Sequence, residues 1–144
     1  MSRSLSFSMN AILISHIFCC FMMTGVIWVI QLVHYPSFKF VTEDKFADFA
    51  KFHASRISWI VLPLMLIEIS TAFFLLSVYQ WGIYNLLSVV LIWLSTFFLS
   101  VPCHNKLQQG KDNVEIKRLV LTNWPRTIIW SFRSAFFAWY FLQI

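Results

Sequence analysis

Residues 83–101 of this chain read IYNLLSVVLIWLSTFFLSV, 19 positions without one Asp, Glu, Lys or Arg. A helix needs about 20 mostly apolar residues to cross the hydrocarbon core of a bilayer, and this stretch has that length. Three further apolar stretches cover residues 9–33, 57–79 and 124–144. The sequence therefore predicts an all-α integral membrane protein, with one four-helix bundle domain covering residues 1–144.

The composition also favours a membrane protein over a water-soluble one. The chain is 59% hydrophobic and only 12% charged, whereas soluble domains are about 25% charged. A net charge of +5 would suit nucleic acid, but most of the basic residues fall in two loops, so we expect no nucleic-acid partner. The loop residues are Lys39, Lys45, Lys51 and Arg56 in the first loop and Lys106, Lys111, Lys117 and Arg118 in the second.

These two loops predict the orientation in the membrane. Short loops rich in Lys and Arg stay in the cytoplasm, and the opposite side carries only Arg3. Both termini are therefore expected outside the cytoplasm. Membrane lipids are then the first expected partners.

The first loop has a helical pattern of its own. Thr42 can cap a helix whose first turn holds two acids, a favourable place for them. Apolar residues then recur at helical spacing from Phe46 to Ile57. We expect an amphipathic helix on the inner membrane surface, between the first and second spans.

Two charged residues are expected to pair inside the membrane. Glu68 is the only acid in the four predicted spans, and at 1.5 Å per residue it lies about 16 Å deep. Arg133 lies at a similar depth, about 13 Å. Burial of either charge is expensive, so the sequence predicts a Glu68–Arg133 ion pair. Such a pair either fixes the helix register or forms an anion or proton site, and both interpretations remain open.

The last helix is expected to begin at Asn123, with Pro125 in its first turn. Asn123, Arg126, Trp130 and Arg133 share one face of that helix. This face is expected to turn toward the interior of the bundle.

Three of the four histidines fall at the expected cytoplasmic boundary. Imidazole serves as a metal ligand, a haem ligand or a general base, and no tight metal-binding spacing such as H-E-x-x-H is present. The metal is therefore left unassigned. The candidate catalytic residues are His34, His53, His104 and Arg126, and the candidate substrate contacts are Arg56, Asn105, Asn123, Trp124 and Trp130.

About forty residues resemble a known family. The segment VPCHNKL at 101–107, followed by LVLTNWPRT at 119–127 and by Arg133, resembles the anthrone-oxygenase-like family of small four-helix membrane proteins. In that family a Pro-x-Asn-type motif closes the third helix, and a Trp and an Arg recur in the fourth. Here Cys103 and His104 separate Pro102 from Asn105.

A second, distant resemblance involves Trp28, Pro36, Arg56 and the Pro63-Leu-Met segment. These residues are similar to the small bacterial haem-containing protoporphyrinogen oxidase family. His16 matches that family's helix-one histidine only with a shifted spacing, so the cofactor stays open between none and haem. Both resemblances imply oxidation of flat, lipophilic, polyaromatic compounds, and the inner membrane of a bacterium as the location.

Three functions follow as alternatives. The first is a small membrane oxidoreductase, or a binding protein, for a lipophilic ring compound, with its site at the cytoplasmic mouth of the bundle. There a histidine would act as base and Arg or Asn would stabilise an anion. The second is a non-catalytic subunit of a larger membrane complex, with other membrane subunits or further copies of the chain as partners. Transport, the third, would require oligomerisation.

Overall fold

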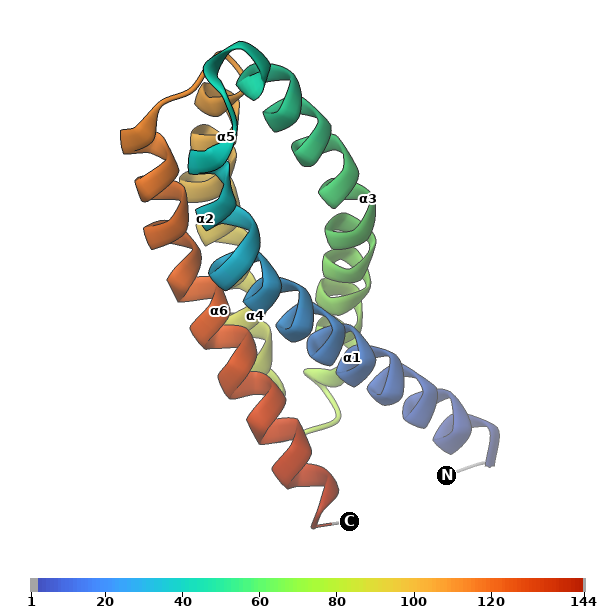
Figure 1. The fold of residues 1–144 in the computed structure, drawn as a ribbon. Coiled ribbons are helices and arrows are strands. Elements are labelled where there is room, and N and C mark those ends of the chain that lie inside the picture. The colour runs from blue at the N-terminus through green and yellow to red at the C-terminus, as the bar shows by residue number, and fades with distance from the viewer. Residues whose placement is uncertain (1–2, 144) are drawn as a thin grey trace.

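The computed structural model describes the backbone of residues 3–143 and the side chains of residues 9–143. This part of the chain is helical, at 89% of residues, and contains no strand. Four long helical segments run past one another (Figure 1), with α1 against α3 and α6, and α4 against α3 and α6. The predicted all-α class is confirmed for the described residues.

Three helical segments are long and apolar enough to cross a membrane: Met9–Phe40, Glu43–Leu75 and Gly82–Leu107. The fourth, α6 (Asn113–Phe141), is not among them. Its first half carries Glu115, Lys117 and Arg118, and two more arginines follow. These charges lower its hydropathy below that of the other three segments.

The first segment consists of several consecutive helices. The helix α1 (Arg3–Val29) continues into a π-helical stretch, Ile30–His34, then α2 (Tyr35–Ser37) and a 3-10 turn, Phe38–Phe40. The third segment repeats this pattern, because α4 (Gly82–Ser95) leads through a π-helical stretch, Thr96–Ser100, into α5 (Val101–Leu107). A π-helical turn is rare and occurs often at functional sites.

The expected surface helix is not a separate element. The helix α3 runs without a break from Glu43 to Leu75 and contains Pro63, and its upper half bows away from α1 (Figure 1). Thr42 occupies the N-cap position, but its side chain makes no capping hydrogen bond. Because apolar residues recur at helical spacing on both sides of residue 57, nothing in the sequence interrupts the helix there.

A tight turn joins α3 to α4. The helix α3 ends at Leu75, ahead of the expected residue 79, and Gly82 begins α4. A Cβ atom at Gly82 would lie 2.7 Å from the carbonyl oxygen of Leu75. Real Cβ contacts are not that short, so the turn requires glycine at this position.

The start of α6 corrects the prediction for the last helix. Its N-cap is Asp112, whose side chain accepts hydrogen bonds from the backbone N–H groups of Val114 and Glu115 at 2.8 Å and 3.2 Å. Asn123 and Pro125 therefore lie inside the helix. The expectation that Asn123 caps the helix is wrong, because the helix already begins after Asp112, which caps it through its side chain.

Candidate functional site

Three histidines from three helical segments meet near the end opposite the termini. His34 ends a π-helical stretch, His53 lies on α3 and His104 on α5. The Nε2 atom of His34 lies 2.6 Å from Nδ1 of His53, with the ring centroids 4.3 Å apart. The centroid of His104 lies 5.6 Å from that of His53. We call these three residues the histidine cluster.

Tyr35 joins the histidine cluster. Its hydroxyl group lies 3.0 Å from Nε2 of His104, and its ring centroid lies 6.0 Å from that of His53. Tyr35 is buried. Tyr35 is not among the candidate site residues that the sequence predicts, because its position directly after His34 does not by itself indicate that it turns inward.

The hydrogen bond between the two imidazoles leaves one ring nitrogen free. The Nδ1 atom of His53 faces His34, while its Nε2 atom is buried and has no hydrogen-bond partner in the part of the chain that the structure describes. If His34 donates, Nε2 of His53 carries a proton that it can give up. If His53 donates through Nδ1, Nε2 is a free acceptor. In both tautomers this atom can take part in proton transfer.

Two cavities lie beside the histidine cluster and divide the site that the sequence predicts as one. A groove of about 610 Å³ runs between α1 and α3 and reaches His34, His53 and Arg56. An inner pocket of about 220 Å³ lies among α1, α3, α4, α5 and α6 and shares Ile30 and Ile57 with the groove. The inner pocket is lined by, among others, Tyr35, Trp93, Ser100, His104, Arg126 and Trp130.

Polar side chains hold Arg126 in place beside the inner pocket. Its Nη2 atom donates to Oδ1 of Asn123 at 2.5 Å, and its Nη1 atom lies 3.4 Å from Oγ1 of Thr96. Asn123 in turn donates to Oε1 of Gln31 at 2.7 Å. Asn123 therefore orients Arg126 and is absent from the lining of both cavities.

Three predicted substrate contacts lie elsewhere or at the rim. Asn105 is exposed and lines neither cavity. Trp124 is partly exposed and packs edge-to-face on Trp28, with centroids 5.9 Å apart. Arg56 is exposed beside the groove, with its guanidinium group 5.4 Å from the ring centroid of Phe52. Asn105 and Trp124 therefore line neither the groove nor the inner pocket.

Glu68 and Arg133 lie in contact inside the protein. Arg133 donates from Nη1 to Oε1 of Glu68 at 2.5 Å, and the two side chains are 7% and 1% exposed. The indole N–H of Trp130 also donates to this carboxylate, at 3.1 Å to Oε2. Since Trp130 lines the inner pocket, the ion pair helps to position one of the pocket's walls.

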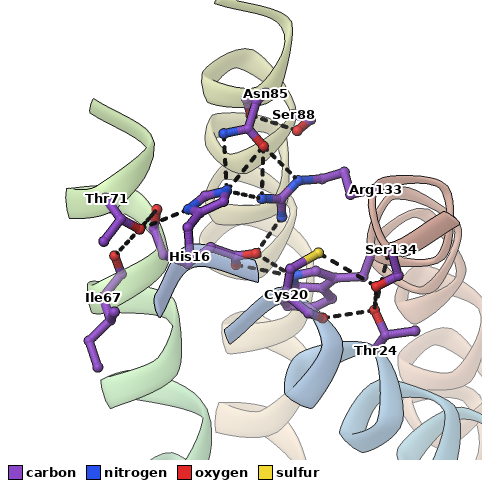
Figure 2. A network of polar contacts seen from close by, with 11 residues as sticks. His16, Cys20, Thr24, Ile67, Thr71, Asn85, Ser88, Arg133 and Ser134 are labelled. Carbon is purple, nitrogen blue, oxygen red and sulfur yellow. Dashed lines mark hydrogen bonds and ion pairs between the residues drawn. The ribbon is translucent and has the colours of Figure 1, made fainter. Parts of the chain in front are cut away.

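His16 and Asn85 complete this network (Figure 2). Arg133 Nη2 lies 3.0 Å from both Oδ1 of Asn85 and Nε2 of His16. Because an arginine only donates, Nε2 of His16 must accept, and the ring proton is on Nδ1, which lies 2.8 Å from Oγ1 of Thr71. Both nitrogens of His16 are therefore engaged, and neither is free to ligate a haem iron.

The sequence offered a partial signal for these partners. From the sequence, His16 was singled out only as a shifted match to the helix-one histidine of the haem-containing family, and no partner was predicted for it. Asn85 was not predicted, although it is an amide within an otherwise apolar span. In a bilayer such a polar side chain normally finds a partner in the protein.

The cluster does not form an evident metal centre. Among the described residues, no group of three or more His, Cys, Asp or Glu side chains is placed to hold a metal ion. The chain was also compared with known proteins. No family model, curated protein or solved structure matches it.

Proposed function

We propose that this protein binds a lipophilic ring compound in the groove between α1 and α3, with the imidazoles of His34 and His53 at the polar end. The observation that carries the proposal is the position of the hydrogen-bonded pair His34 and His53. Together with Arg56, these are the polar side chains that line an otherwise apolar groove. Ligand sites typically combine a predominantly apolar wall with a few polar groups that fix orientation.

The size and position of the groove suit such a ligand. Its volume of about 610 Å³ lies within the range of about 300–1,000 Å³ for small-molecule sites. Exposed apolar residues such as Phe21, Met22 and Ile60 form its edges. In a bilayer these residues would face the acyl chains, so a lipophilic compound could enter from the membrane.

The proposed chemistry is proton transfer at the polar end. The Nε2 atom of His53 would act as the base toward a ring hydroxyl group or an acidic ring C–H, and His34 would hold His53 in one orientation. Arg56 would lie near the anion that forms. The resemblance to anthrone-oxygenase-like proteins implies that this anion is then oxidised, in a membrane oxidoreductase. With dioxygen as the oxidant, one oxygen atom would become the new carbonyl oxygen of the ring and the other would leave as water.

The proposal includes a four-helix membrane bundle with α6 as the fourth span. Two arginines of α6, Arg126 and Arg133, are only 5% and 7% exposed, so these two charges point inward. Its outer face carries Leu121, Ile128 and Phe132, which are exposed. Both described ends of the chain lie at one end of the molecule (Figure 1), which fits both termini outside the cytoplasm of a bacterial inner membrane.

The groove can be tested by filling it. Gly25 lines the groove, and nothing lies within 4 Å of the position of its Cβ. We expect Gly25→Leu to abolish quenching of tryptophan fluorescence by 1,8-dihydroxyanthrone in detergent, while Gly25→Ala retains it. His53→Gln should retain binding and slow the loss of the anthrone absorption band in air.

Absorption spectra and metal analysis of the purified protein would identify any bound haem or metal. Equal binding by the wild-type and Gly25→Leu proteins would refute the groove as the site. If no lipophilic ring compound binds the wild-type protein, the chain is better interpreted as a non-catalytic subunit of a membrane complex.

A further inference from the structure

The two buried arginines of α6 differ in their partners. Arg133 has a carboxylate, Glu68, at 2.5 Å. Arg126, two helical turns away, is equally buried, but no described carboxylate lies within ion-pair distance of it. Its two hydrogen-bond partners, the side chains of Asn123 and Thr96, are neutral. Its Nε atom is buried and has no hydrogen-bond partner among the described residues.

A buried cation without a counter-charge is unfavourable. Removing a guanidinium group from water costs free energy that neutral hydrogen bonds recover only in part. Arg126 also lines the inner pocket of about 220 Å³, and none of the described residues around that pocket is acidic. The missing negative charge can therefore come from a ligand in the pocket.

We infer that the inner pocket binds a small organic anion, with a carboxylate-type oxyanion on Arg126 and an apolar body about one ring in size. The inner pocket adjoins the groove and shares the side chains of Ile30 and Ile57 with it. It takes a ligand of a different class, held by a different polar group, so the inference goes beyond the proposed function.

The other pocket walls agree with this ligand. Trp93 and Ser100 line the pocket, and the indole N–H and the hydroxyl group of these two residues have no partner. Both can donate to an anionic oxygen after small side-chain adjustments. Aromatic and aliphatic side chains, including Phe97, Trp130 and Met65, supply an apolar surface for a ring.

Benzoate and benzamide provide a matched pair of probes, because they share one shape and differ in charge. We expect benzoate, titrated against the purified protein in detergent, to change the fluorescence of Trp93 and Trp130 and to raise the melting temperature. Benzamide should do neither at the same concentrations. Inorganic phosphate, which lacks the apolar body, should bind more weakly than benzoate.

Three variants test the role of Arg126. Arg126→Gln should weaken benzoate binding by at least about 30-fold, the lower end of what loss of a buried charge partner produces. Arg126→Lys keeps the charge and should retain part of the binding. Arg118→Gln removes a positive charge from the same helix outside the pocket and should bind like the wild-type protein.

The inference is overturned if benzamide binds as tightly as benzoate, if Arg126→Gln binds benzoate like the wild-type protein, or if benzoate does not bind at all. Phosphate binding equal to that of benzoate would show an adventitious ion only. The Gly25→Leu protein should still bind benzoate and the Arg126→Gln protein should still bind the anthrone, so failure of either site is recognised separately.

Discussion

Substitution of Arg133 by Met tests the buried ion pair. The change removes the donor that lies 2.5 Å from Glu68 and leaves the carboxylate with only the indole N–H of Trp130. It also removes the donors that face Asn85 and His16. The three acceptors that remain, Glu68, Asn85 and His16, would be buried with at least one donor fewer each.

The expected loss of stability is large. Removing one partner of a buried pair typically costs about 3–5 kcal/mol, because the other charge is left without compensation. Glu68→Leu should have a comparable effect, since it leaves Arg133 without a carboxylate. The double substitution removes both charges and should be milder than the sum of the single ones, with a coupling of about 0.5–3 kcal/mol.

Unfolding in detergent, followed by circular dichroism during a titration with SDS, measures these differences. Arg126→Met is the matched control, since it removes an arginine of similar burial that has no carboxylate partner. We expect that variant to lose less stability than Arg133→Met, because only the neutral acceptors of Asn123 and Thr96 lose a donor. Wild-type midpoints for both Arg133→Met and Glu68→Leu would refute the argument that this pair is an energetically coupled unit.

Three further predictions follow from separate features. Gly82→Ala should destabilise the protein by about 1–3 kcal/mol in the same unfolding assay, because its Cβ would meet the Leu75 carbonyl oxygen at 2.7 Å, whereas Gly25→Ala, with open space around it, should not. The hydrogen bond from Lys106 lowers the pKa of the Glu115 carboxyl group; this contact should stabilise the protein above the ordinary pKa of glutamate and be lost as the pH falls through the lowered value, and Glu115→Gln should abolish that part of the pH dependence. A reporter fused after Ile144 should be extracytoplasmic and one inserted near Gly110 cytoplasmic, and the reverse pattern would contradict the proposed orientation.

The residues that the sequence placed together were those for which burial leaves few alternatives. Glu68 is the only acid in the predicted spans, so a buried arginine at similar depth was its natural partner. The histidine cluster was predictable for a related reason, because His34, His53 and His104 fall at one membrane level and their segments are joined in up-down order. Depth in a membrane can be counted from sequence at a fixed rise per residue.

The rotation of each helix about its own axis could not be obtained from the sequence in this way. The direction in which the His104 side chain points depends on the rotation of α5 about its axis. That rotation depends on the π-helical stretch that precedes α5. The division into a groove and an inner pocket was therefore not foreseen. The start of α6 was a different kind of miss, because Asp112 followed three residues later by Glu115 is a recognisable helix-start pattern.

The π-helical stretches Ile30–His34 and Thr96–Ser100 determine how the helices that follow them, α2 and α5, are rotated about their axes. An α-helix advances by 100° per residue, at about 3.6 residues per turn, so the extra residue that a π-turn accommodates offsets the next segment by about that angle. Deleting one residue from the first stretch would leave a regular helix of almost the same length. It would nevertheless swing Tyr35 about a quarter of a turn away from His104, to which it is now hydrogen-bonded. Such a deletion would hardly alter the hydropathy profile of the sequence. Two chains with almost the same hydropathy profile could therefore differ in whether the histidine cluster and Tyr35 come together.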